Sequence, residues 1–198
     1  MTTVLRFGER PVPRSLAGLP AVRVAADGTA AQTIDDVAAA ARRVIVAGSP
    51  ADLATVLTRL LRTERLDVEV AHAPGWLAAR YAQTAAAQRV PLIRDETGQV
   101  LVGAAIWLPP TSADRIHGEG IVDDTVLFDG EATMVRIEPT ATQPGLRARS
   151  ERGRWVTGRA AQLGTTGARV VRDGVEAPRE VRRSTFYRHT EGWLRVTR

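Results

Sequence analysis

The first residues that could do chemistry lie in a turn after an apolar run. Residues 44–52 read Val-Ile-Val-Ala-Gly-Ser-Pro-Ala-Asp. At a strand–turn–helix junction the first helical N–H groups have no partner inside the helix, so an anion can bind them. A histidine follows a second apolar run, and a glycine opens the next helical pattern. The candidate ligand- or phosphate-binding residues are therefore Gly48, Ser49, His72 and Gly75.

The same turn also has an interpretation that needs no ligand. Ser49 is a good N-cap, Pro50 suits the first helical position, and Asp52 can complete a capping box. The Asp52 carboxylate would also repel a phosphate and compete for the helical N–H groups. We favour capping over anion binding here. For His72, a position at the carboxyl end of a strand suits a ligand, but a structural role is the more common one for a single histidine.

Four acidic residues are candidate metal ligands. Asp129 and Glu131 flank a glycine, and Asp123 and Asp124 precede them. Carboxylate oxygens are suitable ligands for Mg²⁺. No spacing forces these carboxylates to converge, and turn preferences favour a hairpin turn at Asp129 and a solvated loop at Asp123 and Asp124.

Arginine residues concentrate near the end of the chain. Residues 1–145 contain 14 Arg and 17 acidic residues, whereas residues 146–198 contain 13 Arg and 5 acidic residues, a net charge of +8. This segment could bind phosphates, RNA, a ribosome surface, anionic lipid or an acidic partner protein, with Trp155 stacking on a base. Alternatively, it is an exposed loop, with Trp155 in the core. The candidate basic patch comprises Arg147, Arg149, Arg152, Arg154, Arg159, Arg182 and Arg183.

Composition excludes several kinds of site. All 27 basic residues are Arg, there is no Cys, and the three histidines form no HExxH pair. A Walker lysine, a Schiff-base lysine, a thiol nucleophile and a Cys-bound or helical zinc site are therefore excluded. The longest apolar run, residues 100–110, is about half of what a bilayer needs, and no apolar leader precedes Arg6. We expect a cytoplasmic protein without a transmembrane segment, and oligomer formation stays open.

The first half of the chain alternates strand and helix patterns. Strands are predicted at residues 3–7, 21–25, 43–47 and 67–71, and helices at residues 33–42, 50–62 and 76–88. Residues 11–20 are rich in proline and read as a loop. Strands separated by helices of this length indicate βαβ units and a parallel sheet.

From about residue 90 the pattern becomes one of hairpins. The predicted turns are Asp95–Gly98, Asp129-Gly130 and Asp173-Gly174, and residues 192–196 form a last strand. Residues 147–154 are interpreted as an exposed basic loop. The predicted fold class is a parallel, Rossmann-like α/β half, residues 1–90, followed by an antiparallel, β-sandwich-like half, residues 91–198.

This arrangement resembles the diacylglycerol kinase and NAD kinase-like superfamily. There, one strand ends in a Gly-Gly-Asp-Gly-Thr turn, the next ends in Gly-Thr-x-Asn-Asp, and the β domain carries Asp-Gly-Glu. Residues 44–48 look like the first element, residues 67–80 the second and residues 129–131 the third. Gly48 and Gly75 are what remains of the two turns, so the chain looks like a degenerate member. A rival register aligns Asp27-Gly28-Thr29 with the first turn. The chain also resembles an uncharacterised actinobacterial group sometimes labelled zinc peptidase, a label that the missing HExxH motif does not support.

The resemblance implies a kinase-like shape, and the departures from its motifs argue against ATP binding. Our first hypothesis is a non-catalytic protein, without a cofactor, that holds a small anionic ligand or a partner protein. The second is a divergent lipid or nucleotide kinase that binds Mg²⁺ through Asp129 and Glu131. The third is a nucleic-acid or ribosome-surface binder that acts through the basic patch.

Overall fold

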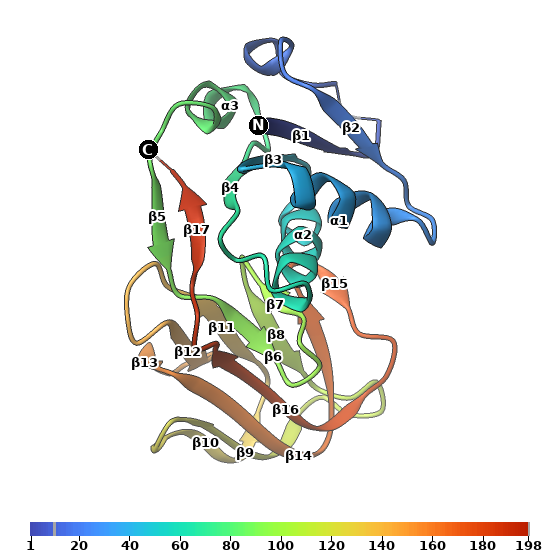
Figure 1. The fold of residues 1–198 in the computed structure, drawn as a ribbon. Helices are drawn as coiled ribbons and strands as arrows, with labels where there is room; N and C mark the ends of the chain where they lie inside the picture. The colour runs from blue at the N-terminus through green and yellow to red at the C-terminus, as the bar shows by residue number, and fades with distance from the viewer. Residues whose placement is uncertain (10, 198) are drawn as a thin grey trace. The chain divides into compact units, whose positions relative to one another are not determined.

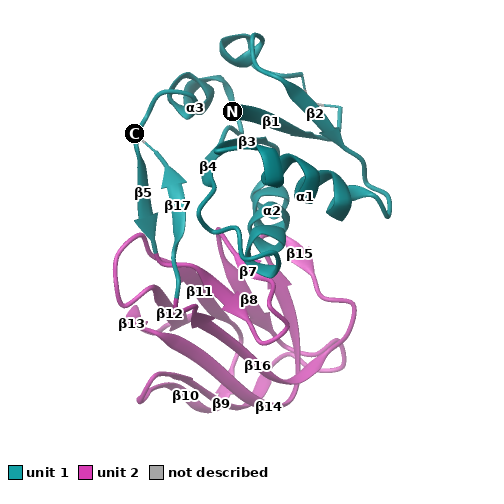
Figure 2. Cartoon of the chain, in the orientation of Figure 1, with its two compact units in different colours: residues 1–90, 191–198 teal, residues 91–190 magenta. Residues whose placement is uncertain are grey.

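The computed structural model describes residues 1–9 and 11–197, which form two compact units (Figures 1 and 2). Unit 1 comprises residues 1–90 and 191–198, and unit 2 comprises residues 91–190. Unit 1 is α/β and unit 2 is antiparallel β, as the sequence predicted. Residues 191–198, predicted to lie in the β half, belong to unit 1 in the structure. Unit 2 is therefore an insertion within the chain of unit 1.

Unit 1 is built on a mostly parallel sheet. The strands occur in the order β2 (Ala21–Val24), β1 (Thr2–Phe7), β3 (Arg43–Ala47), β4 (Glu69–His72), β17 (Trp193–Val196) and β5 (Ala87–Val90). Only β5 runs antiparallel to its neighbour, β17. Central strands such as β3 are buried on both faces, which explains their unbroken apolar sequence. In this order the carboxyl ends of β1 and β3 are neighbours, the position where such sheets bind ligands.

The helices of unit 1 cover the sheet. They are α1 (Ala30–Ala40), α2 (Pro50–Arg62), a single 3-10 turn, η1 (Arg14–Leu16), and α3 (Trp76–Ala82). Helices α1 and α2 pack side by side, joined by the Arg59–Asp35 ion pair. The other face carries α3 and η1, whose core with the sheet is mostly small: Val4, Leu16, Ile45, Ala47, Ala71, Ala73, Ala79, Ala82 and Val196. Small side chains let a short helix lie close to the strands. No helix within residues 1–9 and 11–197 is long and apolar enough to cross a bilayer.

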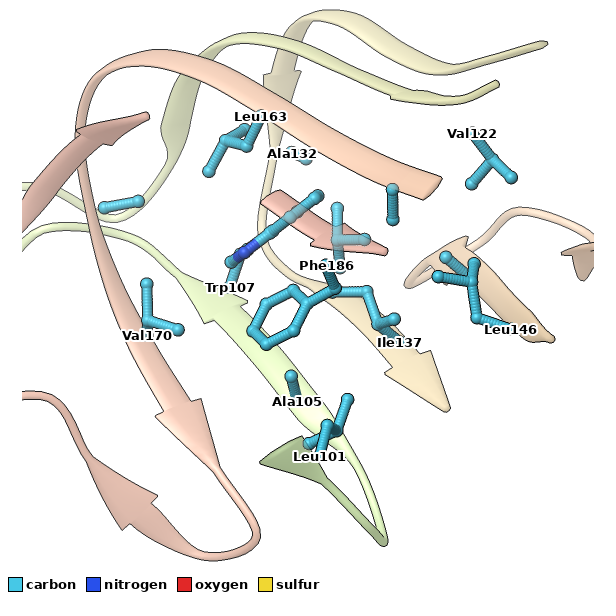
Figure 3. Close-up of a cluster of buried hydrophobic side chains, with 14 of the residues drawn as sticks. Leu101, Ala105, Trp107, Val122, Ala132, Ile137, Leu146, Leu163, Val170 and Phe186 are labelled. Atoms are coloured by element: carbon cyan, nitrogen blue, oxygen red, sulfur yellow. The ribbon is translucent and has the colours of Figure 1, made fainter. Parts of the chain in front are cut away.

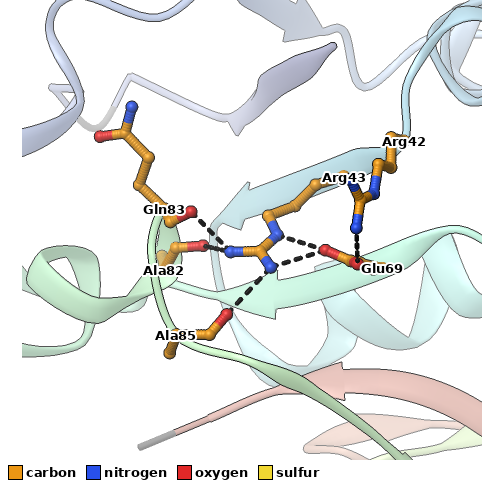
Figure 4. A network of polar contacts seen from close by, with 6 residues as sticks. All are labelled: Arg42, Arg43, Glu69, Ala82, Gln83 and Ala85. Carbon is orange, nitrogen blue, oxygen red and sulfur yellow. Dashed lines mark hydrogen bonds and ion pairs between the residues drawn. The ribbon is translucent and has the colours of Figure 1, made fainter.

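Helix α3 ends six residues earlier than predicted, because two tertiary interactions override local propensity. Residues 87–90 form β5 and pair with β17. In addition, Arg43 holds the carbonyl groups at the end of α3 (Figure 4): its Nη1 donates to Ala82 O at 3.1 Å and to Gln83 O at 2.6 Å, and its Nη2 donates to Ala85 O at 2.9 Å. The Arg43 Nε donates to Glu69 Oε2 at 2.7 Å. One guanidinium therefore joins β3, β4 and α3.

Unit 2 consists of antiparallel strands that meet at one long strand, β14 (Ala160–Arg172). One side of β14 pairs with β16 (Val181–Arg188), and the other pairs with β8 (Ala105–Leu108) and β9 (Ile116–Val122) in turn. The remaining strands are β6 (Ile93–Asp95), β7 (Val100–Leu101), β10 (Thr125–Ala132), β11 (Val135–Pro139), β12 (Leu146–Ser150), β13 (Val156–Gly158) and β15 (Val175–Glu176). Strands β9 and β13 were not predicted from the sequence.

The core of unit 2 gathers around Trp107 and Phe186, whose ring centroids lie 6.2 Å apart (Figure 3). The Trp107 Nε1 donates a hydrogen bond of 3.0 Å to Ser184 Oγ, and all three residues are buried. Beside them the fully buried Asp95 forms an ion pair with Arg172, with 2.7 Å between Oδ2 and Nε. The core is thus apolar but contains two polar pairs that must be satisfied internally.

Two of the three predicted hairpin turns are confirmed. The turn after Asp95 joins β6 to β7, and the Asp95 carboxylate accepts hydrogen bonds from the N–H groups of Thr97 and Gln99. Asp173 and Gly174 have φ values of 49° and 86°, as a type I′ turn requires. This turn joins β14 to the short β15, which precedes the strand predicted after it.

The prediction of a turn at Asp129-Gly130 is wrong, because β10 continues through both residues. The hairpin turn lies at Asp123 and Asp124, between β9 and β10. Asp123 has a φ of 52°, and its carboxylate accepts hydrogen bonds from the N–H groups of Arg159 and Ala160. These bonds fix the turn before β10, whereas the Asp-Gly signal lies within β10.

We predict that Arg43→Gln destabilises the protein by about 3 kcal/mol, because it leaves a buried carboxylate and three carbonyl groups without their donor. The Arg43 and Glu69 side chains are 11% and 14% exposed. The matched control is Arg42→Gln, since Arg42 approaches the same Glu69 at 3.4 Å but is 83% exposed. Urea unfolding followed by circular dichroism should show a loss of less than about 0.5 kcal/mol for the control. Equal losses in the two variants would contradict the assignment.

In unit 2 we predict that Ser184→Ala costs about 1 to 3 kcal/mol, because the buried indole N–H loses its acceptor. In a Trp107→Phe background the same change should cost much less, since no donor remains to be satisfied. A double-mutant cycle of unfolding free energies measures the difference. Additive losses would mean that the hydrogen bond contributes nothing.

Candidate functional site

The turn at the head of α2 is closed by the chain's own carboxylate. The Asp52 Oδ2 accepts the backbone N–H of Ser49 at 2.7 Å and its hydroxyl at 2.8 Å. In return Ser49 Oγ accepts the N–H of Asp52 at 3.2 Å. The capping box that the sequence predicted is confirmed. The Ser49 N–H and hydroxyl, which a bound anion could use at this end of the helix, are therefore taken by the Asp52 carboxylate, and the Asp52 N–H is taken by the Ser49 hydroxyl.

Gly48 is required by the same contact. A Cβ at this position would lie 2.6 Å from the Asp52 Oδ2, well inside contact distance. The backbone of the turn and the carboxylate therefore approach each other as closely as a glycine permits.

His72, at the end of β4, lies next to this turn. Its Nε2 is 3.0 Å from Gly48 O. Because a carbonyl oxygen only accepts, Nε2 carries the proton and Nδ1 is the acceptor of the neutral ring. Burial lowers the pKa of His72, and Arg195 on β17 acts in the same direction, while the bond to Gly48 and the charge of Asp52 oppose them. The structure thus brings Gly48, Ser49 and His72 together, with Asp52 and Arg195 beside them.

Gly75, the fourth candidate, makes no comparable contact. A Cβ there would meet nothing within 4 Å. The residue is exposed and caps α3 through its backbone alone. It lies at the start of a different helix and does not join the turn at Gly48.

The rival turn, Asp27-Gly28-Thr29, is also occupied by its own acid. The Asp27 Oδ1 accepts the N–H of Thr29 at 2.8 Å, and its hydroxyl as well. These hydrogen bonds lower the pKa of Asp27. Both turns that could take a phosphate therefore hold a carboxylate instead.

The candidate metal ligands are dispersed over one hairpin. Asp123 is engaged by backbone N–H groups, and Glu131 lies 3.5 Å from both Arg115 and His117. Asp129 is exposed and lies opposite Glu119 on β9. Within the described residues no group of three His, Asp or Glu side chains is arranged to hold a metal ion.

The predicted basic loop at residues 147–154 is in part a strand. Arg147 and Arg149 lie on β12 and are exposed, while Leu146 and Ala148 between and beside them are buried. This alternation of buried and exposed residues is the strand period. The β11–β12 pairing sets Arg136 opposite Arg149 and Glu138 opposite Arg147.

Five arginines form what we call the arginine surface: Arg136 on β11, Arg147 and Arg149 on β12, and Arg152 and Arg154 in the segment leading to β13. Trp155 supports it, with the Cζ atoms of Arg147 and Arg149 at 4.3 and 4.7 Å from its ring centroid. Such stacking orients guanidinium groups and leaves their edges to donate hydrogen bonds. Trp155 is half-buried beneath these arginines.

Carboxylates neutralise only part of this surface. Glu138 accepts from Arg136 at 2.7 Å and from Arg147 at 2.6 Å. Burial raises the pKa of Glu138, but the hydrogen bonds from these two arginines outweigh it and hold the pKa below its usual range. Within residues 1–9 and 11–197, Arg149 has no ion pair, and Glu138 is the carboxylate that pairs with arginines of this surface.

The other predicted basic residues lie elsewhere. Arg159 follows β13, where its N–H is bonded to Asp123. Arg182 and Arg183 are on β16, separated from β12 in the sheet by β11, β8 and β14. Conversely, sequence reasoning missed Arg136. The strand period of residues 146–149 would have indicated the β11–β12 hairpin that brings it into place.

Comparison with known proteins identifies the fold. No protein-family model matches the sequence, and no curated protein does. Three solved structures from Bacillus anthracis str. Sterne, assigned as diacylglycerol kinases, two of them provisionally, match with TM-scores of 0.76, 0.72 and 0.77. Their identities to this chain are 13, 13 and 11%, with 100% of this chain and 97% of each of theirs covered.

A second kind of kinase shares the arrangement. The NAD kinase from Archaeoglobus fulgidus, solved in complex with ATP, matches with a TM-score of 0.65 at 10% identity, covering 100% of this chain and 94% of its own. With an apolar run ending at Gly48, a helix capped by Ser49 and Asp52, and an antiparallel β unit after residue 90, the chain shares its fold with these diacylglycerol kinase and NAD kinase structures.

Proposed function

We propose that this protein is a non-catalytic member of the kinase-like fold that binds a phosphate-bearing ligand through the arginine surface. One observation carries the non-catalytic part. The Asp52 carboxylate accepts the N–H and the hydroxyl of Ser49 at the head of α2, at the carboxyl end of β3. This is the turn that the resemblance aligns with the glycine-rich phosphate turn of the superfamily.

A triphosphate does not fit this turn. To reach the Ser49 N–H it would have to displace a carboxylate that lies 2.7 Å from that nitrogen. The displacement would break the capping box, and the displaced carboxylate would remain a like charge beside the phosphate. Asp27 presents the same obstacle at the neighbouring turn. These contacts argue against ATP binding and phosphoryl transfer at either turn.

A divergent magnesium-dependent kinase gains no support from the acidic residues. Asp123 is committed to the backbone of Arg159 and Ala160, and Glu131 faces Arg115 and His117. The carboxylate opposite Asp129 in the described hairpin is that of its cross-strand neighbour Glu119. We therefore set this alternative aside in favour of binding.

The arginine surface supports the binding part. Its five arginines exceed its carboxylates, and Arg149 keeps its donors while Trp155 orients it. Guanidinium groups held in this way match phosphate oxygens in geometry and charge. The ligand chemistry is a phosphate group, and a single-stranded nucleic acid and a small phosphate compound are its two possible sources.

We predict that inorganic phosphate and ATP leave the Ser49 N–H signal of the wild-type protein unchanged in NMR titrations. In Asp52→Ala the freed donors should respond, and α2 should lose about 1 kcal/mol of stability with its cap. The matched control is Asp36→Ala, which removes one exposed charge from α1. The proposal fails if the wild-type Ser49 signal shifts saturably, or if phosphoryl transfer from ATP is measured.

For the arginine surface we predict that Arg149→Gln weakens binding of a single-stranded RNA oligonucleotide about tenfold, the effect of losing one charged hydrogen bond. The wild-type affinity should fall steeply with added salt. The matched control is Arg179→Gln, an exposed arginine outside the arginine surface. Fluorescence anisotropy gives the dissociation constants, and competition with inorganic phosphate or ATP distinguishes a small ligand from a polymer. Equal affinities for the two variants would contradict the assignment.

A further inference from the structure

Helix α3 exposes its two largest apolar side chains. Trp76 and Leu77, the first two residues of the helix, are 67% and 59% exposed. Pro74 and Gly75 immediately before them are exposed as well. Single apolar residues at a surface are ordinary, but a continuous exposed run of this kind marks an interaction site.

The exposed residues share one face of the helix. Ala79 and Ala82 are buried against the sheet. Arg80 follows Trp76 by four positions and Tyr81 follows Leu77 by four, so each pair is adjacent along the helix surface. The outward face thus carries an indole, an isobutyl group, a guanidinium and a phenol ring.

The surroundings of this face are cationic. Residues 11–26 and 70–94 contain no Asp or Glu. The η1 turn packs against α3, and its Arg14 is exposed. Of the acidic residues that border these segments, Glu9 pairs with Arg23, Glu69 with Arg43 and Asp95 with Arg172, and Asp27 accepts hydrogen bonds from Thr29. Apolar area and positive charge therefore occur together in segments that contain no Asp or Glu.

We propose that this α3 surface, made of Pro74–Leu77, Arg80 and Tyr81 with Arg14 beside it, docks on an anionic phospholipid bilayer. Tryptophan and leucine enter the boundary between headgroups and acyl chains, where an amphipathic ring is favoured. The arginines lay their stems along the apolar area and keep their charge at the lipid phosphates.

Charge argues against a second copy of the chain as the occupant. A two-fold contact through this face would bring Arg14 and Arg80 of both copies together. With no carboxylate on the face, those like charges would repel each other. An anionic membrane supplies the missing negative charge. This surface is in unit 1 and is independent of the arginine surface, which lies in unit 2.

The experiment is co-sedimentation of the full chain with vesicles of equal amounts of phosphatidylcholine and phosphatidylglycerol. The wild type should bind these vesicles reversibly, bind pure phosphatidylcholine weakly, and lose affinity with salt. The double variant Trp76→Ser/Leu77→Ser should lose at least about tenfold in affinity, since it removes the inserted apolar area. Arg80→Gln should lose about fivefold, as one arginine contributes at an anionic surface.

The matched control is Val126→Ser/Val175→Ser, which removes two exposed apolar side chains, 53% and 59% exposed, from unit 2. It should bind like the wild type. The proposal is overturned if the wild type binds no vesicles, or if Trp76→Ser/Leu77→Ser binds as well as the wild type. Loss of vesicle binding in Arg149→Gln alone would attribute the affinity to the arginine surface, and a dimer that only Trp76→Ser/Leu77→Ser abolishes in sedimentation velocity would assign this face to a second copy. Either result would also overturn the proposal.

Discussion

A helix N-terminus favours a negative charge beside it, and at the head of α2 the chain supplies that charge itself. The Asp52 carboxylate satisfies the Ser49 N–H and hydroxyl, and its position fixes Gly48 because a side chain there would overlap it. His72 then donates to the carbonyl of Gly48, tying the end of β4 to the same turn. The ring of contacts closes without a ligand. A phosphate bound at this turn would compete with the capping box for the Ser49 N–H.

A second charged residue, Arg43, joins three elements of unit 1. Arg43 lies on β3, pairs with Glu69 on β4 and ends α3 by binding three carbonyl groups there. A helix that stops this early covers little of the sheet, and its alanines fit close to the strands. Its first residues, Trp76 and Leu77, remain outside that packing and are exposed.

Patterns confined to a single helix or strand could be predicted from the sequence, whereas the pairing of that helix or strand with distant parts of the chain could not. The α2 helix was predicted to the residue, because Ser49, Pro50 and Asp52 specify its start, and Leu53, Val56, Leu57 and Leu60 recur at helical spacing along it. The strand 192–196 was recognised, but its place between β4 and β5 depends on pairing across a whole inserted unit. The same limit explains α3, where β5 forms only because β17 is beside it. At Asp129-Gly130 a strong turn signal failed because Asp123 offers a turn stabilised by two backbone N–H groups from another part of the chain. For the candidate site, the capping box was predictable, but Arg136 joins the arginine surface only through the β11–β12 register.

The two glycines that match the superfamily's motifs therefore have different physical meanings here. In a phosphate turn a glycine lets the backbone approach the ligand, whereas Gly48 lets it approach Asp52. A Cβ at Gly75 would have no neighbour within 4 Å, so the packing around this residue imposes no requirement for glycine. Its φ of −161° is one that any residue adopts. A glycine that matches a phosphate-binding motif is thus evidence of phosphate binding only when the space beside it is empty and the neighbouring backbone N–H groups are free. At Gly48 the Asp52 side chain fills that space. At Gly75 the space is free, and the residue is exposed at the start of α3, next to Trp76 and Leu77.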